Sequence, residues 1–197
     1  MLDWLKHINK EYPEFWKSYL TKFEKKPNRF VVLCTQTSGQ NPNKDVIFSF
    51  GGIAVIGSEM LVGDSFEVIL LQYKYLHDNE LSNTFIIEST LPKMQENHAV
   101  EEFINYVGNA ILVGYRIHYD VELINAALEK IDCGRLKNEA LDIEIMYRKW
   151  KDADGHFTLD QLCTEFKVPK VERSSASEEA YAMALIFLKL KSRLGIN

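Results

Sequence analysis

The first stretch of the chain carries apolar residues at helical spacing. Between residues 2 and 25 they recur mostly every three or four positions, which predicts a helix with one apolar face, divided or kinked by Pro13. The residues of this stripe are Leu5, Ile8, Tyr12, Phe15, Trp16, Tyr19 and Phe23. We expect an N-terminal helical extension over residues 1–28, which either packs on the main domain or docks a polymerase or another protein partner.

Three stretches of β-forming residues follow, at 30–36, 46–56 and 65–72. The segments "GQNPNKD" and "GSEMLVGD" separate them, and connections this short predict an antiparallel meander of three strands. The pair Gly51-Gly52 interrupts the second stretch, which indicates a bulge or a close approach of another backbone.

Beyond the meander, helical and strand patterns alternate. We expect a helix at 97–109, a short buried strand at 110–114 and a helix at 118–131. The rest is largely helical: 140–150 begins as a strand and becomes a helix, and two further helices follow at 158–166 and 175–194. Thr158 is the expected N-cap of the first of these two, and Ser175, with Glu178 three residues later, has capping-box spacing. The pattern predicts one α/β domain over 29–197, built around a mixed sheet flanked by helices.

Composition narrows the class of protein. The chain has 197 residues, 46% hydrophobic and 26% charged, which suits a single globular domain. No apolar run approaches the roughly 20 residues that span a bilayer, and the acids near the N-terminus are untypical of a targeting peptide. We therefore expect a cytoplasmic protein that makes no membrane contact. Its three cysteines, without metal-knuckle or redox spacing, are expected to be reduced thiols.

Charge argues against a protein that coats nucleic acids, because the formal net charge is -5. Basic residues nevertheless outnumber acidic ones over residues 1–29. A ligand with phosphates would find local basic surface there, although lysines on the solvated face of a helix explain the same pattern.

Chemistry-bearing residues gather at the ends of the predicted elements. Cys34 and Gln36 end the first strand on one face, because strand residues two apart point the same way. Asp120 begins the helix after "ILVG", and Ser174 and Glu179 lie at the start of the last helix.

The order and setting of these segments resemble the DEDD-type 3′–5′ exonucleases of the RNase H-like fold. The subgroup is the histidine-containing one, which includes the proofreading epsilon subunit of bacterial DNA polymerase III. Here "CTQTSG" stands where the family has Asp-x-Glu-Thr-Thr-Gly. The segment "GYRIHYD" matches Gly-His-Asn-x-x-Phe-Asp, and "SSASEEA" matches His-x-Ala-x-x-Asp-Ala.

The resemblance implies a two-metal site for Mg²⁺ or Mn²⁺, held by four carboxylates, with a histidine as the general base. Carried over residue by residue, the first-motif Asp and Glu are Cys34 and Gln36, and the second-motif Asp is kept as Asp120. The third-motif His is Ser174, and the third-motif Asp is Glu179. A thiol is a poor ligand for hard cations and an amide lacks the charge, so we expect no two-metal site and at most weak Mg²⁺ or Mn²⁺ binding by Asp120 and Glu179.

Three functions stay open. The first is a pseudonuclease that still binds single-stranded DNA or RNA. The second is a residual or altered metal-dependent nuclease, for which a zinc site is also conceivable. That site would comprise Cys34, His118, Asp120 and Glu179. The third is a replisome-associated interaction module that docks through the N-terminal helix.

Candidate contacts to nucleic acid lie in the first two motifs: Thr37, Tyr115, Arg116 and His118. One hypothesis places the Arg116 guanidinium beside Asp120 and Glu179, where a metal would otherwise lie; alternatively it faces solvent or a phosphate. Purely structural interpretations also remain. Cys34 can be a small core filler, and acids at helix starts are favoured by the helix dipole alone.

Overall fold

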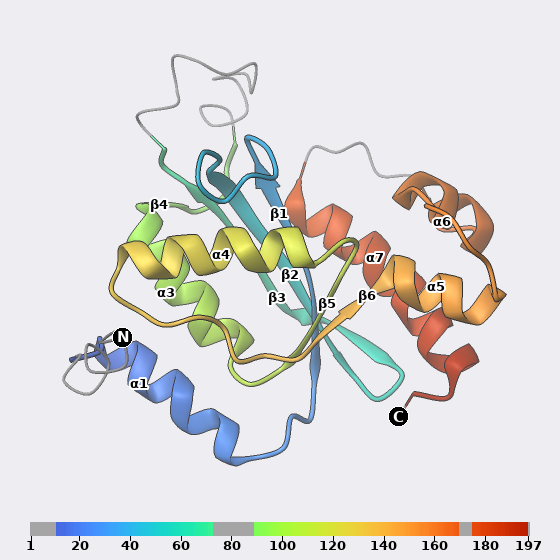
Figure 1. Cartoon of the computed structure of the whole chain (residues 1–197), viewed down its shortest axis with the longest axis horizontal. Helices are drawn as coiled ribbons and strands as arrows, with labels where there is room; N and C mark the ends of the chain where they lie inside the picture. The colour runs from blue at the N-terminus through green and yellow to red at the C-terminus, as the bar shows by residue number, and fades with distance from the viewer. Residues whose placement is uncertain (1–10, 73–88, 170–174, 197) are drawn as a thin grey trace, which may run out of the picture.

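The fold is described from a computed structural model, for residues 11–72, 89–169 and 175–196. Helices cover both faces of a mixed sheet (Figure 1). Its strands are β1 (Phe30–Thr37), β2 (Ile47–Ile56), β3 (Glu59–Leu70), β4 (Lys93–Met94), β5 (Ile111–Gly114) and β6 (Ala140–Asp142), in the order β4-β3-β2-β1-β5-β6. The predicted α/β class, with an antiparallel meander plus parallel strands, is confirmed: β1, β2 and β3 pair antiparallel, and β5 and β6 run parallel to β1.

The helices form two layers, and β1 explains why. Its apolar run is buried on both sides, as expected of a central strand. Val31 and Leu33 face α1 (Glu14–Thr21), α3 (Glu96–Val107) and α4 (His118–Lys130). Phe30 and Val32 face α5 (Ile143–Lys151), α6 (Leu159–Phe166) and α7 (Ala176–Leu194).

The third strand differs from its prediction. We expected it to begin at residue 65, but β3 begins at Glu59, and "EMLVGD" is strand rather than loop. The connection to β2 is only the pair Gly57-Ser58, where Gly57 has a φ of 57° that suits glycine. The pairing of β2 with β3 shifts its register between Ile53 and Ala54, so the irregularity lies one residue past the glycine pair.

The glycine pair also admits a close backbone approach, as predicted. A Cβ atom on Gly51 would lie 2.2 Å from the carbonyl carbon of Ala176, so the first turn of α7 rests directly on β2. Both cap predictions for the late helices are confirmed. Thr158 caps α6 in a reciprocal capping box with Gln161, and the Ser175 hydroxyl accepts from the Glu178 N–H at the start of α7.

The N-terminal stripe is partly core. Leu5 and Ile8 lie outside the described residues, and α1 begins directly after Pro13. Trp16 and Tyr19 of α1 are buried at 1% and 0% exposure against the α3 and α4 layer, before the short 3₁₀ helix η2 (Lys22–Glu24). These aromatic residues are therefore not available to dock a partner. The division at residues 28 and 29 stays a prediction. None of the helices in the described parts is both long and apolar enough to cross a membrane.

Candidate functional site

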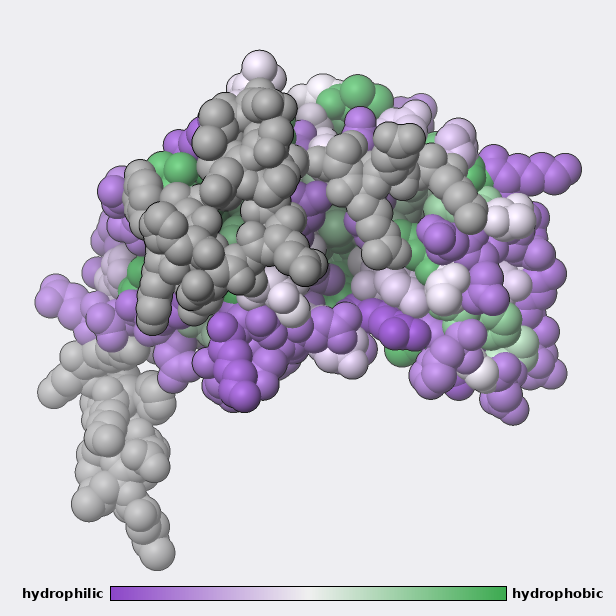
Figure 2. Space-filling model, turned by 90° about the horizontal axis from the view of Figure 1, so that it is seen from above, coloured by the Kyte–Doolittle hydropathy of each residue, from purple (hydrophilic) through white to green (hydrophobic). Residues whose placement is uncertain are grey.

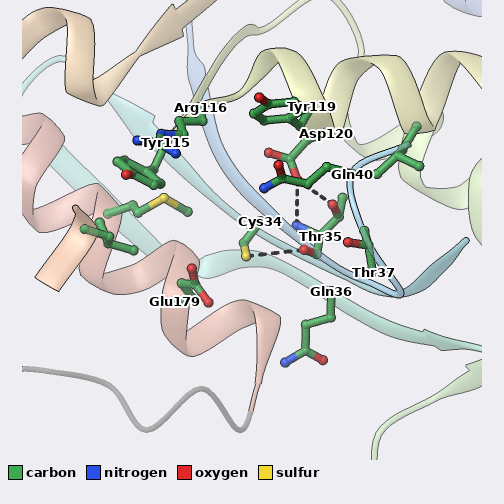
Figure 3. A pocket seen from close by; sticks show the side chains of 13 residues that line it. Cys34, Thr35, Gln36, Thr37, Gln40, Tyr115, Arg116, Tyr119, Asp120 and Glu179 are labelled. Atoms are coloured by element: carbon green, nitrogen blue, oxygen red, sulfur yellow. Dashed lines mark hydrogen bonds between the residues drawn. The ribbon is translucent and has the colours of Figure 1, made fainter. Parts of the chain in front are cut away.

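A pocket of about 420 Å³ opens at the C-terminal end of β1, between the first turns of α4 and α7 (Figure 3). Figure 2 views this end of the molecule, where hydrophilic side chains surround smaller apolar patches. The pocket is lined by Cys34, Thr35, Gln36, Thr37, Gln40, Tyr115, Arg116, Tyr119, Asp120, Leu123, Leu159, Glu179 and Met183. All three sequence motifs thus contribute residues to one pocket.

Cys34 lies at the inner edge of this pocket. It is only 8% exposed and packs in the apolar cluster beneath α7. Its thiol faces the carbonyl oxygen of Thr35 at 3.8 Å. Free cysteine is among the most buried residue types and behaves as a small apolar side chain, so this environment suits a neutral thiol.

Gln36 turns away from the other polar groups. Its side-chain oxygen accepts a hydrogen bond from the hydroxyl of Ser49 at 2.7 Å, and Ser49 is fully buried in β2. Figure 3 shows the amide pointing away from Asp120. The oxygen that could have replaced a carboxylate ligand is therefore engaged within the sheet.

Asp120 lies in the first turn of α4 and is bound by the strand beside it. Its Oδ1 accepts from the N–H of Thr35 at 3.2 Å and also from the Thr35 hydroxyl. Burial raises the pKa of Asp120 to about 7, the negative charge of Glu179 adds to the rise, and the two bonds from Thr35 oppose it. The carboxyl therefore keeps its proton to a higher pH than an ordinary aspartate does.

Glu179 reaches the pocket from α7, and the start of this helix is anchored by an acid that sequence reasoning missed. Glu67 of β3 accepts from the Ser177 N–H at 3.2 Å, from the Ser177 hydroxyl at 2.6 Å and from the Ser175 hydroxyl. In the sheet, Glu67 lies opposite Gly51 and Gly51 lies opposite Cys34. The three residues form one row across β1, β2 and β3, and Glu67 at the end of this row holds the start of α7. The only feature that could have pointed to Glu67 was its position opposite the strand glycine Gly51.

Arg116 lines the pocket, but it does not bridge Asp120 and Glu179 as one hypothesis had it. Its Nε instead donates to Oε2 of Glu144 at 3.0 Å. Burial would raise the pKa of Glu144, but hydrogen bonds from Phe157, Arg116 and His156 outweigh it and lower that pKa below its usual range. Glu144 was the second acid that sequence reasoning missed, because its partners come from distant loops.

His118 lies apart from the pocket. It is exposed at the start of α4 and lines a separate hollow with Ile145 and Leu194. The conceivable zinc site with Cys34, Asp120 and Glu179 is therefore not assembled. Within the described ranges, no group of three or more His, Cys, Asp or Glu residues is placed to hold a metal ion.

The remaining predicted residues have local roles or lie outside the described parts. Thr37 lines the pocket, and its hydroxyl donates to the carbonyl of Gly39 at 2.8 Å. Asp142, which lies outside the pocket, caps α5 and also accepts from the Ile117 N–H at 3.1 Å. Ser174 falls in a segment that is not described. Binding roles for Thr37, Tyr115, Arg116, Asp120 and Glu179 stay predictions.

Comparison with known proteins defines the class. The model of an exonuclease family matches residues 31–187, so the chain belongs to this family. The predicted RNase H-like fold and DEDD-type exonuclease family are thereby confirmed.

Individual relatives agree with this assignment. The PolC-type DNA polymerase III of Staphylococcus epidermidis is 25% identical over 174 residues, which cover 85% of this chain and 12% of that polymerase. Escherichia coli exonuclease I in complex with a dT13 oligonucleotide matches with a TM-score of 0.66 at 14% identity, over 85% of this chain and 42% of that one. Exonuclease X in complex with 5′ overhanging duplex DNA matches with a TM-score of 0.59 at 13% identity, over 85% and 94%. The chain thus spans only a small part of the polymerases it resembles.

Proposed function

We propose that this protein binds single-stranded DNA or RNA at the pocket and does not hydrolyse it by the two-metal route of its family. Membership of the exonuclease family supports the nucleic-acid ligand. Two structural neighbours support it further, one in complex with a dT13 oligonucleotide and one with 5′ overhanging duplex DNA.

The observation that carries the proposal is the state of the β1 end of the pocket. Cys34 is buried and packs in the apolar cluster, and the only oxygen of the Gln36 side chain accepts from Ser49. Among the described residues that line the pocket, Asp120 and Glu179 are the two carboxylates. Two Mg²⁺ ions clamping one phosphate need several charged oxygen ligands, which this wall of the pocket does not supply.

The donor set does not fit the metal ions of the family. Asp120 Oδ1 already accepts two hydrogen bonds from Thr35, and its raised pKa means that part of the population carries a proton rather than a free carboxylate. A metal would have to displace that proton, and the only other carboxylate among the described residues that line the pocket is Glu179.

A restoration experiment tests the proposal. The variant C34D/Q36E/S174H/E179D returns the family's residues, and C34D/Q36E/S174H/E179D/D120N is its matched control with one ligand removed. We expect the unmodified protein to leave 5′-labelled single-stranded DNA and RNA intact with Mg²⁺, Mn²⁺ or Zn²⁺. The restored variant should shorten them from the 3′ end, and the control should not. Degradation by the unmodified protein at rates comparable to the restored one would overturn the proposal.

Degradation and binding of the same labelled strands separate the other candidates. A slow, Mn²⁺-dependent activity lost in D120N alone would favour a residual nuclease that uses Asp120 and Glu179. No binding of DNA or RNA at low salt by the unmodified protein would favour the interaction module. Burial already makes Trp16 and Tyr19, two residues of that module's docking stripe, inaccessible to a partner.

A further inference from the structure

Arg116 occupies a constrained place on the rim of the pocket. It lies between β5 and α4 with a φ of 52°, a conformation that is uncommon for residues other than glycine. The next residue, Ile117, donates its N–H to Oδ2 of Asp142 at 3.1 Å. The backbone that carries Arg116 is thus fixed by the N-cap of α5.

A buried glutamate fixes one edge of the Arg116 side chain. Glu144 has a side chain only 8% exposed, and its Oε2 accepts from Arg116 Nε at 3.0 Å. Its other oxygen accepts from the Phe157 N–H at 2.9 Å and lies 3.3 Å from His156 Nδ1. Because both oxygens are engaged, the carboxylate cannot turn without breaking a second contact.

A tyrosine ring fixes the flat side of the same group. The guanidinium carbon of Arg116 lies 5.3 Å from the ring centroid of Tyr115, in cation–π range. The Tyr115 hydroxyl donates to the carbonyl oxygen of Phe157 at 3.0 Å. The backbone of Phe157 thus holds Tyr115 through its carbonyl and Glu144 through its N–H. We call Tyr115, Glu144 and the Phe157 backbone the arginine frame.

The frame leaves the terminal nitrogens of Arg116 available. A guanidinium has five N–H donors, and the frame uses the one on Nε. No hydrogen bond joins the terminal nitrogens to any part of the chain that the structure describes, and the side chain is 35% exposed. Among the described residues that line the pocket, Arg116 is the only basic one (Figure 3).

We propose that Arg116 is the phosphate-binding residue of this pocket and that Glu144 is its positioning residue; this rests on the proposed nucleic-acid binding. The ligand is a phosphodiester of a polynucleotide backbone, because two parallel N–H donors match two phosphate oxygens. Asp120 and Glu179 in the same pocket repel a phosphate, so the contact depends on a cation held on the rim in one orientation.

The first test compares two arginines. Arg135 pairs with Glu122 in an exposed ion pair away from the pocket, so R135A changes the charge as R116A does. Affinity for a labelled 12-nucleotide single strand is measured by fluorescence anisotropy between 25 and 200 mM salt. We expect R116A to bind roughly tenfold more weakly and to lose about 0.7 from the salt slope, while R135A binds like the unmodified protein.

The second test separates positioning from simple structural support. E144Q keeps the volume of the side chain and leaves the charge on Arg116, and E122Q is its control. We expect E144Q and R116K each to weaken binding about threefold without changing the salt slope, and E122Q to have no effect. The double variant R116A/E144Q should bind no more weakly than R116A, because the glutamate acts only through the arginine. Circular dichroism of each variant establishes that it is folded.

The outcomes distinguish a failure of this proposal from a failure of the proposed nucleic-acid binding on which it rests. R116A with unchanged affinity and slope would overturn the phosphate assignment alone, and additive losses in R116A/E144Q would overturn the positioning role of Glu144. Displacement of the oligonucleotide by inorganic phosphate at equal concentration would overturn the polynucleotide ligand. No binding by the unmodified protein at 25 mM salt would overturn the proposed function itself and this inference with it.

Discussion

Two regions beside the pocket treat their polar residues in opposite ways. Behind Arg116, at the start of α5, Asp142 and Glu144 accept several hydrogen bonds each, and the pKa of Glu144 is lowered. On the pocket wall formed by β1, Cys34 and Gln36 are not carboxylates, and Asp120 beside them has a pKa raised to about 7.

The difference shows what each region does. The acids at the start of α5 accept hydrogen bonds from backbone N–H groups and from Arg116. The positions on β1 where the family has metal-binding carboxylates hold Cys34 and Gln36, which need no cation. In a metal site several carboxylates lie close together and a cation offsets their repulsion, and β1 contributes no such carboxylates. The variants below test this difference between the two regions.

Gly51→Ala should have the largest effect, because it separates the sheet from the helix that carries Glu179. The new Cβ would lie 2.2 Å from a backbone atom of Ala176, so α7 has to move. We expect a loss of about 3–5 kcal/mol in the free energy of unfolding, or failure to fold. Gly63→Ala, with nothing within 4 Å, is the control, and urea denaturation is the measurement. A loss below 1 kcal/mol in Gly51→Ala would contradict the close approach.

Asp120→Asn tests the raised pKa of this carboxyl directly. The unfolded chain ionises this residue near pH 4 and the folded protein near pH 7, so its ionisation opposes folding, increasingly from pH 4 to 7 and fully above pH 7. We expect D120N to be more stable than the unmodified protein at pH 8, by on the order of 2–3 kcal/mol, and this gain to vanish at pH 4. Urea titrations at both values measure it. A gain that is larger at pH 4 would contradict the raised pKa.

Glu144→Ala tests the hydrogen-bonded region at the start of α5. The Phe157 N–H and Arg116 lose their acceptor, and a buried donor without a partner costs about 2 kcal/mol. Denaturation at pH 7 should show this loss, and Glu122→Ala, on the exposed ion pair, should stay within about 0.5 kcal/mol of the unmodified protein. Equal effects in the two variants would mean that the hydrogen bonds of Glu144 contribute no more than an exposed ion pair.

Cys34→Ala should have the smallest effect. A buried thiol that only fills space leaves a small cavity, which costs about 1 kcal/mol. Oligonucleotide affinity in the presence of Mn²⁺ should not change. A fall in affinity that appears only when Mn²⁺ is present would show that the thiol is a ligand and that the β1 wall is not inert.

Much of the architecture could be read from the sequence because it follows local rules. The apolar run within residues 30–36 predicted a strand, and Thr158 and Ser175 marked the starts of two helices. The true start of β3 could not be predicted, because residues 59–64 have no strong strand pattern, and Glu59 to Leu61 pair with β2 beyond a register shift. Local preference does not reveal a pairing that another strand imposes.

The site shows the same division. Cys34, Gln36, Asp120 and Glu179 line one pocket, as the resemblance to the exonuclease family implied. Glu67 and Glu144 escaped notice because their partners lie at least 12 residues away and no spacing in the chain reports them. His118 was grouped with Asp120 because it lies two positions away, yet at the helix start the two residues face different hollows.

The central claim, binding without metal-dependent hydrolysis, is tested most directly on the unmodified protein in one sample. A single-stranded oligonucleotide labelled at its 5′ end is incubated with excess protein, with Mn²⁺ or with EDTA, and both retention and length are measured. The account predicts equal retention and full-length strand in both conditions. Shortening from the 3′ end that requires Mn²⁺ and is abolished by Asp120→Asn would contradict it.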